Sequence, residues 1–455
     1  MQGLLSDKKF LKRMLSIALP VMIQNFISSF LNMIDTVMVG KMGETEIAAV
    51  GIANQYFFFF HMFLIGIAFG CAIFVAQFWG KKDIANIRRI LGIGLVSSLI
   101  VSLIFMLVGF AGPARIIGLF NREPAVLQAG AVYLRIVLIA YIFTGVTFTY
   151  NAALRAVGNA FLPMMISGVA LFVNAFFNYV LIFGKLGFPE LGVAGAAMAT
   201  VIARVLETVI LVASVYLSNG VLAAKFKELT SFTLQYAKDT YRIVLPTLFN
   251  DINFGLANLI YQAVYGWMGS QAVAAVQICN TINNMFMIVV FGLGNAATVM
   301  IGNSIGAGRE EEAKIYAGRF LLLSLLTGII LGVFLALAAQ PLLSFFNVSE
   351  TVSHASRIIL YTMAAVFVVR ILGFMYIVGV LRGGGDVKQA FYIEAVTMWL
   401  IGVPLTILGA MVFRFPVYVV YALAVAEEVT KCFIAAARVK SGKWIKNVTR
   451  DLVME

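Results

Sequence analysis

Two stretches of the chain decide its interpretation: LPVMIQNFISSFLNMIDTVMVGKMG at 19–43 and LPTLFNDINFGLANLIYQAVYGWMG at 245–269. Each is largely apolar over a length that can span a bilayer, which takes roughly 20 residues. A shift of 226 residues aligns their Leu-Pro starts, their Gly-x-Met-Gly ends and, further on, Ala48-Ala49-Val50 with Ala274-Ala275-Val276. Apolar composition alone does not align Pro and Gly in order. We therefore infer an internal repeat.

The composition places the whole chain in a membrane. Of its 455 residues, 62% are hydrophobic and 12% are charged, whereas an ordinary soluble domain has about 25% charged residues. This excludes a soluble enzyme with a single membrane anchor, and we predict an all-α polytopic membrane protein. The twelve predicted helices span about 14–38, 46–78, 90–111, 125–151, 160–183, 193–217, 240–264, 272–303, 315–339, 353–381, 388–411 and 416–438.

Basic residues predict the topology. The chain has 33 Lys and Arg residues. With the N-terminus inside, 23 of them fall on the cytoplasmic side and 6 on the other, the bias expected of cytoplasmic loops. We expect a multi-pass protein of the cell (inner) membrane with both termini cytoplasmic. The net charge of +12 lies in short segments between apolar runs, so nucleic acid is not expected as a partner.

The repeat predicts two lobes. We assign residues 1–217 to an N-lobe of six helices, 218–241 to a cytoplasmic linker and 242–455 to a C-lobe of six helices. The linker mixes Phe, Leu, Tyr and Lys, which suggests an amphipathic stretch at the membrane interface. Transporters commonly use such repeats, with the substrate bound between the lobes.

Charged residues inside the predicted helices are candidate functional groups, because each must be compensated in the membrane. The acids are Asp35, Glu207, Asp251, Glu394, Glu427 and Glu428, and the bases are Arg135, Arg204, Arg370 and Lys431. The spacing of Arg204 with Glu207 and of Glu427 with Lys431 predicts ion pairs within single helices that mainly support structure. Asp35, Asp251 and Glu394 have no such neighbour, which favours a cation or proton site.

Asp35 has candidate partners on two other predicted helices. Asn174 and Asn178 are four residues apart on one helix face, and Thr200 adds a hydroxyl oxygen. One carboxylate with neutral oxygens suits Na⁺, while the carboxylate alone suffices for H⁺. The alternatives are that Asp35 meets water at the membrane interface and that the asparagines only hydrogen-bond between helices.

The second half carries a further group of polar residues. Asn250 and Asp251 follow Pro246, and the next helix carries Gln277, Asn280 and Asn284. This polar density favours a wet cavity over a lipid-facing surface. The three cysteines and two histidines lack metal-site spacing, and we find no nucleophile–base set. We therefore expect neither a cofactor nor an enzyme.

These segments resemble the multidrug and toxic-compound extrusion (MATE) transporters of the MOP flippase superfamily over essentially the whole chain. The resemblance rests on the stretch at 18–55, on LRAVGNAFLPM at 154–164, on IGNSIGAGR at 301–309 and on IVGVLRGGGDVKQAF at 377–391. It implies two six-helix bundles around a V-shaped central cleft, and export of organic, often cationic, drug-like compounds in exchange for Na⁺ or H⁺. By motif position, it implies that Asp35, Asn174, Asn178 and Thr200 form the cation site.

The resemblance also bears on the second half. Glu394 matches an acidic position of some relatives, and we expect it to pair with Arg370. The competing function is a flippase for lipid-linked oligosaccharides or cell-wall precursors, which the acidic Asp35 site and the twelve helices disfavour. Besides small molecules, we expect membrane lipid as the only partner of a monomeric protein.

Overall fold

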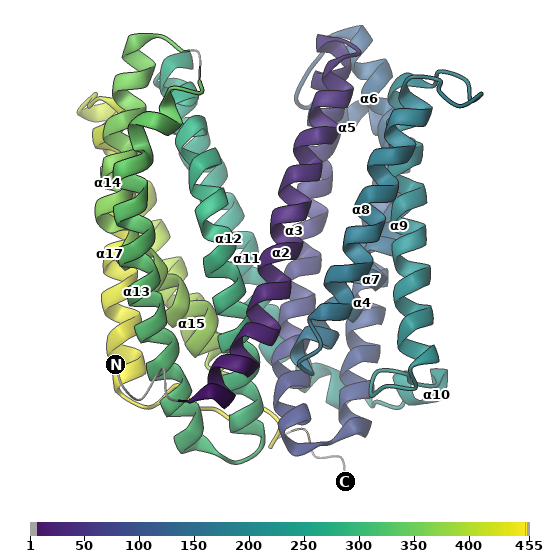
Figure 1. The fold of residues 1–455 in the computed structure, drawn as a ribbon, viewed down its shortest axis with the longest axis vertical. Coiled ribbons are helices and arrows are strands. Elements are labelled where there is room, and N and C mark those ends of the chain that lie inside the picture. The colour runs from purple at the N-terminus through teal and green to yellow at the C-terminus, as the bar shows by residue number, and fades with distance from the viewer. Residues whose placement is uncertain (1–6, 347, 451, 453–455) are drawn as a thin grey trace. The chain divides into compact units, whose positions relative to one another are not determined.

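A computed structural model of the chain describes residues 7–346, 348–450 and 452, leaving aside the side chains of Leu31 and Asn32. The described residues are almost entirely helical, and long helices run side by side along one direction within each part of the chain (Figure 1). Their only β feature is an isolated antiparallel bridge between Gly385 and Ile445. The predicted all-α class is confirmed.

In the first half, from residue 7 onward, the structure describes nine helices, two of them short. They are α2 (Lys8–Gly40), α3 (Glu44–Lys81), α4 (Ile84–Ala111), α5 (Pro113–Gly118), α6 (Pro124–Val137), α7 (Ala140–Ala156), α8 (Phe161–Ile182), α9 (Gly192–Leu217) and α10 (Phe226–Leu229). α6 and α7 together occupy the fourth predicted helix, which is bent by 51° at the break. The other long helices match the predicted ones to within several residues.

The second half contains π-helical segments as well as α-helices. The elements are α11 (Leu234–Trp267), α12 (Ser270–Gly306), α13 (Glu310–Leu343), α14 (Glu350–Phe374), η1 (Met375–Arg382), α15 (Val387–Thr397), η2 (Met398–Gly402), α16 (Val403–Ile407), η3 (Leu408–Val412) and α17 (Val417–Lys440). α14 continues into η1 as one span, and α15 to η3 form another. α11 begins six residues before its predicted start, inside the predicted linker.

Ten helices within the described residues are long and apolar enough to cross a membrane, or eleven if the bent pair counts as one span. α17 corresponds to the twelfth predicted helix, but its middle carries three charged residues, Glu427, Glu428 and Lys431. The chain is thus a multi-pass membrane protein. α17 is not among the apolar spans, and a position within the membrane would require partners for its charges inside the protein.

Repeated glycines allow the same backbone turns in both halves. Gly43 and its counterpart Gly269 precede α3 and α12 with φ of 150° and 108°. Gly158 and Gly385, which a shift of 227 aligns, have φ of 89° and 84°. These φ values favour glycine because other residues carry a Cβ that clashes there. The aligned glycines of the sequence repeat are therefore conformational requirements.

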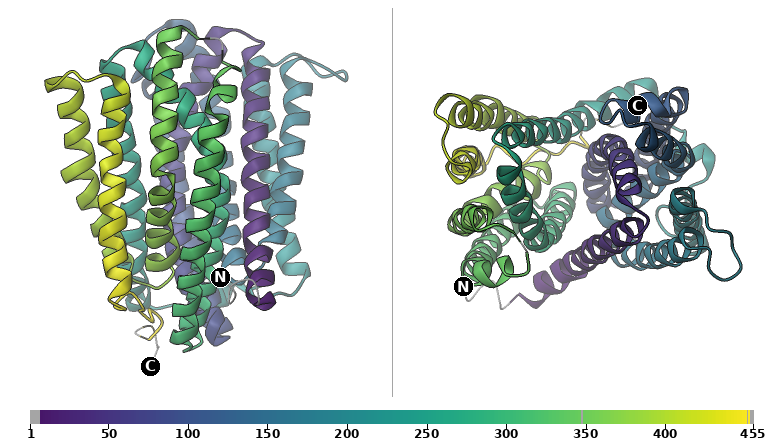
Figure 2. Two further views of the ribbon diagram at one scale, coloured as in Figure 1. Left: turned by 60° about the vertical axis from the view of Figure 1, so that its left-hand side comes forward. Right: turned by 90° about the horizontal axis from the view of Figure 1, so that it is seen from above.

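The chain forms two compact units whose boundaries fall inside α2 and α11. We call Leu19–Leu248 the N-unit, and the residues up to Ala18 together with those from Phe249 onward the C-unit. α8 and α9 lie side by side in the N-unit, and α13, α14 and α17 do so in the C-unit (Figures 1 and 2). The start of α2 and the end of α17 lie at the same end of the C-unit (Figure 1).

The start of α2 is fixed within the C-unit by residues of α13. Asp7 accepts a hydrogen bond from Arg319 at 2.6 Å, and the ring of Phe10 packs 5.3 Å from the rings of Tyr316 and Phe320. The backbone N–H of Phe10 and the guanidinium of Arg319 hold the pKa of Asp7 below its usual value. The first turns of α2 therefore belong to the fold of the second half.

Correspondingly, the first turns of α11 pack in the N-unit against glycines of α3. A Cβ atom at Gly66 would lie 2.5 Å from Cα of Leu248, and one at Gly70 would lie 2.8 Å from Cα of Val244. Such close approach of two helix backbones requires small residues. Arg88 of α4 holds the linker through an ion pair with Glu228 at 2.7 Å.

We predict that Gly66→Ala destabilises the protein by about 1–3 kcal/mol, because the new methyl group overlaps the α11 backbone. The measurement is the thermal melting of the purified protein in detergent. Gly168→Ala in α8 is the matched control, since a Cβ there has open space, and it should melt at the same or a higher temperature. Equal melting of the two variants would contradict the close packing of α3 on α11.

Candidate functional site

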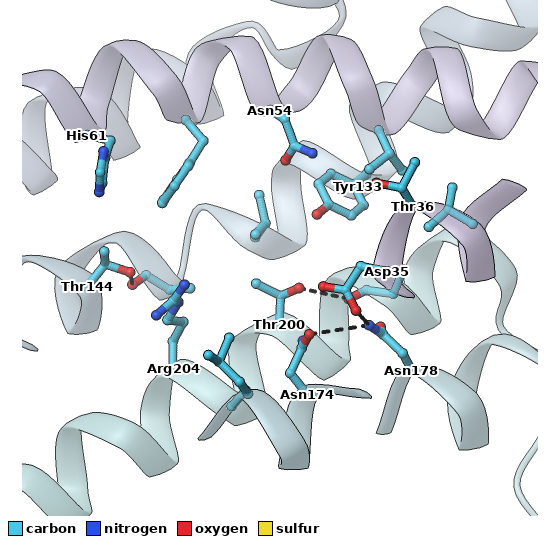
Figure 3. Close-up of a pocket in the computed structure, with 18 of the residues that line it drawn as sticks. Asp35, Thr36, Asn54, His61, Tyr133, Thr144, Asn174, Asn178, Thr200 and Arg204 are labelled. Carbon is cyan, nitrogen blue, oxygen red and sulfur yellow. Dashed lines mark hydrogen bonds between the residues drawn. The ribbon is translucent and has the colours of Figure 1, made fainter. Parts of the chain in front are cut away.

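A cavity of about 510 Å³ lies within the N-unit (Figure 3). Its wall comes from α2, α3, α6, α7, α8 and α9. The polar and charged side chains that line it are Asp35, Thr36, Asn54, His61, Tyr133, Tyr141, Thr144, Asn174, Asn178, Thr200, Arg204 and Glu207. All four residues of the predicted cation site therefore reach one cavity.

Asp35 is tied to the α8 asparagines. Asn178 donates from Nδ2 to Asp35 Oδ1 at 2.7 Å and to Asn174 Oδ1 at 3.4 Å (Figure 3). Asn178 is only 2% exposed, and its Oδ1 atom is buried without a hydrogen-bond partner. Thr200, which also lines the cavity, donates to the backbone oxygen of Ala196 at 3.1 Å. An unsatisfied buried carbonyl oxygen beside a carboxylate is the environment that a cation would complete.

Arg204 and Glu207 form the predicted ion pair, with Arg204 Nη1 2.7 Å from Glu207 Oε2. Both also line the cavity, which the spacing of the pair did not indicate. Thr200, Arg204 and Glu207 are four and three residues apart, so they share one face of α9. That spacing was the sequence signal that could have placed the pair beside Asp35.

Several lining residues had no sequence signal. His61 stacks at 5.7 Å on Phe57 and meets Phe148 edge-on at 4.6 Å. Tyr133 comes from α6, whose contribution depends on the bend before α7. The aromatic run at 56–60 also contributes to packing, because Phe60 stacks at 4.3 Å on Tyr141.

The C-unit encloses a second polar cluster. Arg382 Nη2 lies 2.8 Å from Asp251 Oδ1, and Asn250 donates to Glu394 at 2.7 Å. Lys431 lies 2.9 Å from Glu427, as predicted, and 3.8 Å from Glu394. Asp251 and Glu394, which lacked partners at helical spacing, therefore find cations on other elements.

The predicted pairing of Arg370 with Glu394 is wrong. Arg370 donates instead to Glu428 at 2.8 Å, to Asn283 at 2.9 Å and to Tyr421 at 3.2 Å. Two of these partners lie on α17, which packs beside α14. The choice between Glu394 and Glu428 depends on which faces of α14 and α17 meet, and helical spacing does not specify that.

The remaining predicted polar residues lie on α12. Gln277 and Asn284 are exposed, and Asn280 is half-buried. Gln277 donates to Gln262 of α11 at 3.0 Å. Within the described residues, no hydrogen bond joins these three side chains to the charged cluster of the C-unit. Their role in a wet cavity stays a prediction.

Comparison with known proteins gives the family. The MatE family model matches residues 20–180 and 246–408. The two matched segments begin 226 residues apart, which is the shift that aligns the repeat.

Individual relatives match nearly the whole chain. A probable multidrug resistance protein NorM of Thermotoga maritima is 24% identical over 98% of this chain and 96% of its own length. The multidrug resistance protein MdtK of Yersinia pestis is 27% identical over 86% of each. A solved MOP superfamily transporter from Pyrococcus furiosus has the same fold, with a TM-score of 0.85, 18% identity and coverage of 96% and 97%.

Lys431 tests whether the C-unit cluster supports structure. We predict that Lys431→Met costs about 3–5 kcal/mol of stability, because it leaves two buried carboxylates without their cation. The double variant Lys431→Met/Glu427→Leu should recover part of the loss. Lys314→Met, which breaks a surface pair with Glu311, is the control and should cost at most about 1 kcal/mol. An equally small loss of melting temperature in Lys431→Met and Lys314→Met would contradict a structural role of Lys431.

Proposed function

Because the chain belongs to the MatE family of multidrug and toxic-compound extrusion transporters, we propose that it exports organic, mainly cationic, compounds across the cell membrane in exchange for Na⁺ or H⁺. The relatives named as multidrug resistance proteins support the export of drug-like compounds. The 23 to 6 bias of basic residues supports cytoplasmic termini. The observation that carries the ion coupling is Asp35 beside the unsatisfied oxygen of Asn178.

The charge balance of the cavity supports one monovalent cation. Among its Asp, Glu, Lys and Arg side chains, the cavity is lined by two carboxylates, Asp35 and Glu207, and one guanidinium, Arg204. Arg204 is hydrogen-bonded to Glu207, so the surplus negative charge falls on Asp35. An ionised carboxylate inside a helix bundle is costly until a cation or proton neutralises it. One Na⁺ or one H⁺ restores neutrality.

The neighbours of Asp35 suit either ion in different ways. Na⁺ would take the Asp35 carboxylate together with the oxygens of Asn174, Asn178 and Thr200, and so satisfy Asn178 Oδ1. A proton needs only the carboxylate. An organic cation that uses the same surplus charge competes with the ion, and this competition is the coupling free energy an antiporter requires.

We predict that Asp35→Asn lowers ion-driven efflux more than about tenfold, because the amide keeps the shape but carries no charge for the ion to neutralise. The measurement is the ion-gradient-driven uptake of a fluorescent organic cation into everted membrane vesicles at matched expression. Glu123→Gln, an exposed acid preceding α6, is the control and should transport normally. Full ion-driven flux in Asp35→Asn would contradict the proposed ion coupling. Absence of organic-cation flux in the unaltered protein would favour the lipid-precursor flippase.

A variant of the α8 asparagines tests whether Na⁺ is the coupling ion. If Na⁺ is the coupling ion, Asn178→Ala should raise the Na⁺ concentration for half-maximal efflux about five- to tenfold, through loss of one ligand. Efflux is compared under a Na⁺ gradient at fixed pH and under a pH gradient in Na⁺-free medium. An unchanged Na⁺ response would mean that Asn174 and Asn178 only connect helices.

A further inference from the structure

A chain of buried hydrogen bonds leaves the cavity at Glu207. Ser167 of α8 donates to Glu207 Oε1 at 2.7 Å, and Gln24 of α2 donates to Ser167 Oγ at 2.8 Å. Arg155, near the end of α7, donates to Gln24 Oε1 at 2.5 Å. Gln24 is 8% exposed and Ser167 is 6% exposed, so water does not replace these bonds.

All three hydrogen bonds run in the same donor-to-acceptor direction. The series starts at the Arg155 cation, passes through the Gln24 amide and the Ser167 hydroxyl, and ends at the Glu207 carboxylate. Bonds aligned in this manner polarise one another and strengthen the whole chain. Because Glu207 also accepts from Arg204, the strength of its bond to Ser167 depends on how strongly Arg204 holds the same carboxylate.

The C-unit has a counterpart built from repeat-equivalent positions. Shifts of 226 and 227 residues align Gln24 with Asn250, Arg155 with Arg382, Ser167 with Glu394 and Arg204 with Lys431. There the amide of Asn250 likewise donates to residue 394, Arg382 pairs with α11, and Lys431 lies near Glu394. Both units therefore use the same positions to hold the helix that follows each unit boundary, α2 or α11.

The two clusters differ at the position that carries Ser167 in the N-unit and Glu394 in the C-unit. In the C-unit the amide donates directly to a carboxylate, Glu394, so the chain ends there. In the N-unit Ser167 both accepts from Gln24 and donates onward to Glu207, a residue of the cavity wall. A hydroxyl can both accept and donate, whereas an ionised carboxylate such as Glu394 can only accept. Ser167 thus connects Gln24 of α2 to the Glu207 carboxylate of the cavity wall.

We propose that Gln24 and Ser167 are positioning residues. They link the charge state of the Asp35 cavity to the hydrogen bond by which Arg155 holds Gln24 of α2. This inference rests on the proposed function. Asp35 and Gln24 are 11 residues apart on α2, about three turns, and so lie on nearly the same face. Asp35, Arg204 and Glu207 line the same cavity, so both carboxylates attract the Arg204 cation. When an ion neutralises Asp35, Arg204 is attracted to Glu207 alone, which weakens the bond from Ser167 to Glu207. Ion binding at one point of α2 thereby changes its attachment at another.

The test compares Ser167→Ala, Gln24→Leu and the double variant in the everted-vesicle assay. Each single change should lower the maximal rate of ion-driven efflux about fivefold or more, and the double variant should be no slower than the slower single variant, because both changes break the same chain. Ser167→Thr keeps the hydroxyl and should restore the rate. Ser98→Ala, which deletes an equally buried hydroxyl bonded to Thr149 at 2.9 Å, should keep the rate.

Three results would overturn the link: a normal rate in Ser167→Ala, rate losses that multiply in the double variant, or a Ser98→Ala loss equal to that of Ser167→Ala. Thermal melting of each purified variant separates slower transport from loss of folded protein, and Ser167→Ala against Ser167→Thr decides the question if Gln24→Leu does not fold. Retained coupling in Asp35→Asn disproves the proposed function. Lost coupling there with a normal rate in Ser167→Ala disproves only the link.

Discussion

A charge inside the membrane needs a partner, and the arrangement of the described helices follows this requirement. A single uncompensated charge at the centre of a span costs about 2.5–3.5 kcal/mol on insertion scales. In the C-unit, four acids pair with three basic residues on α11, α14, η1, α15 and α17: Asp251, Glu394, Glu427 and Glu428 with Arg370, Arg382 and Lys431. These bonds hold α17 in the fold even though it is too charged to count as an apolar span.

The N-unit meets the same requirement with fewer charges. Arg204 satisfies Glu207, while Asp35 receives a neutral amide from Asn178. A hydrogen bond stabilises a carboxylate less than an opposite charge does. This difference in charge balance is the reason why we place the proposed cation at Asp35 and not in the C-unit.

The internal repeat explains how two such different clusters arose on one scaffold. Gln24 and Asn250 donate to the equivalent positions 167 and 394. Arg155 and Arg382 both bond to the helix after the unit boundary, but at neighbouring positions, Gln24 and Asp251. At the position shared by Ser167 and Glu394 the first half has a hydroxyl and the second half a carboxylate, so the bonds continue to Glu207 in the N-unit and end at Glu394 in the C-unit.

The sequence by itself determined the helices, their twofold repeat, the turns at Gly43 and Gly269, and the ion pairs of Arg204 with Glu207 and Glu427 with Lys431. These features depend on apolar length, on φ and on contacts one helical turn apart, all of which are local. The convergence of Asp35 with Asn174, Asn178 and Thr200 also followed, because each is polar in an apolar helix. Only the tertiary structure decided that Arg370 meets Glu428, that Asp251 meets Arg382 and that Gln24 meets Ser167. Those contacts join residues 58 to 143 positions apart, and they depend on how each helix is rotated and displaced along its neighbour, which the spacing of residues within one helix does not specify.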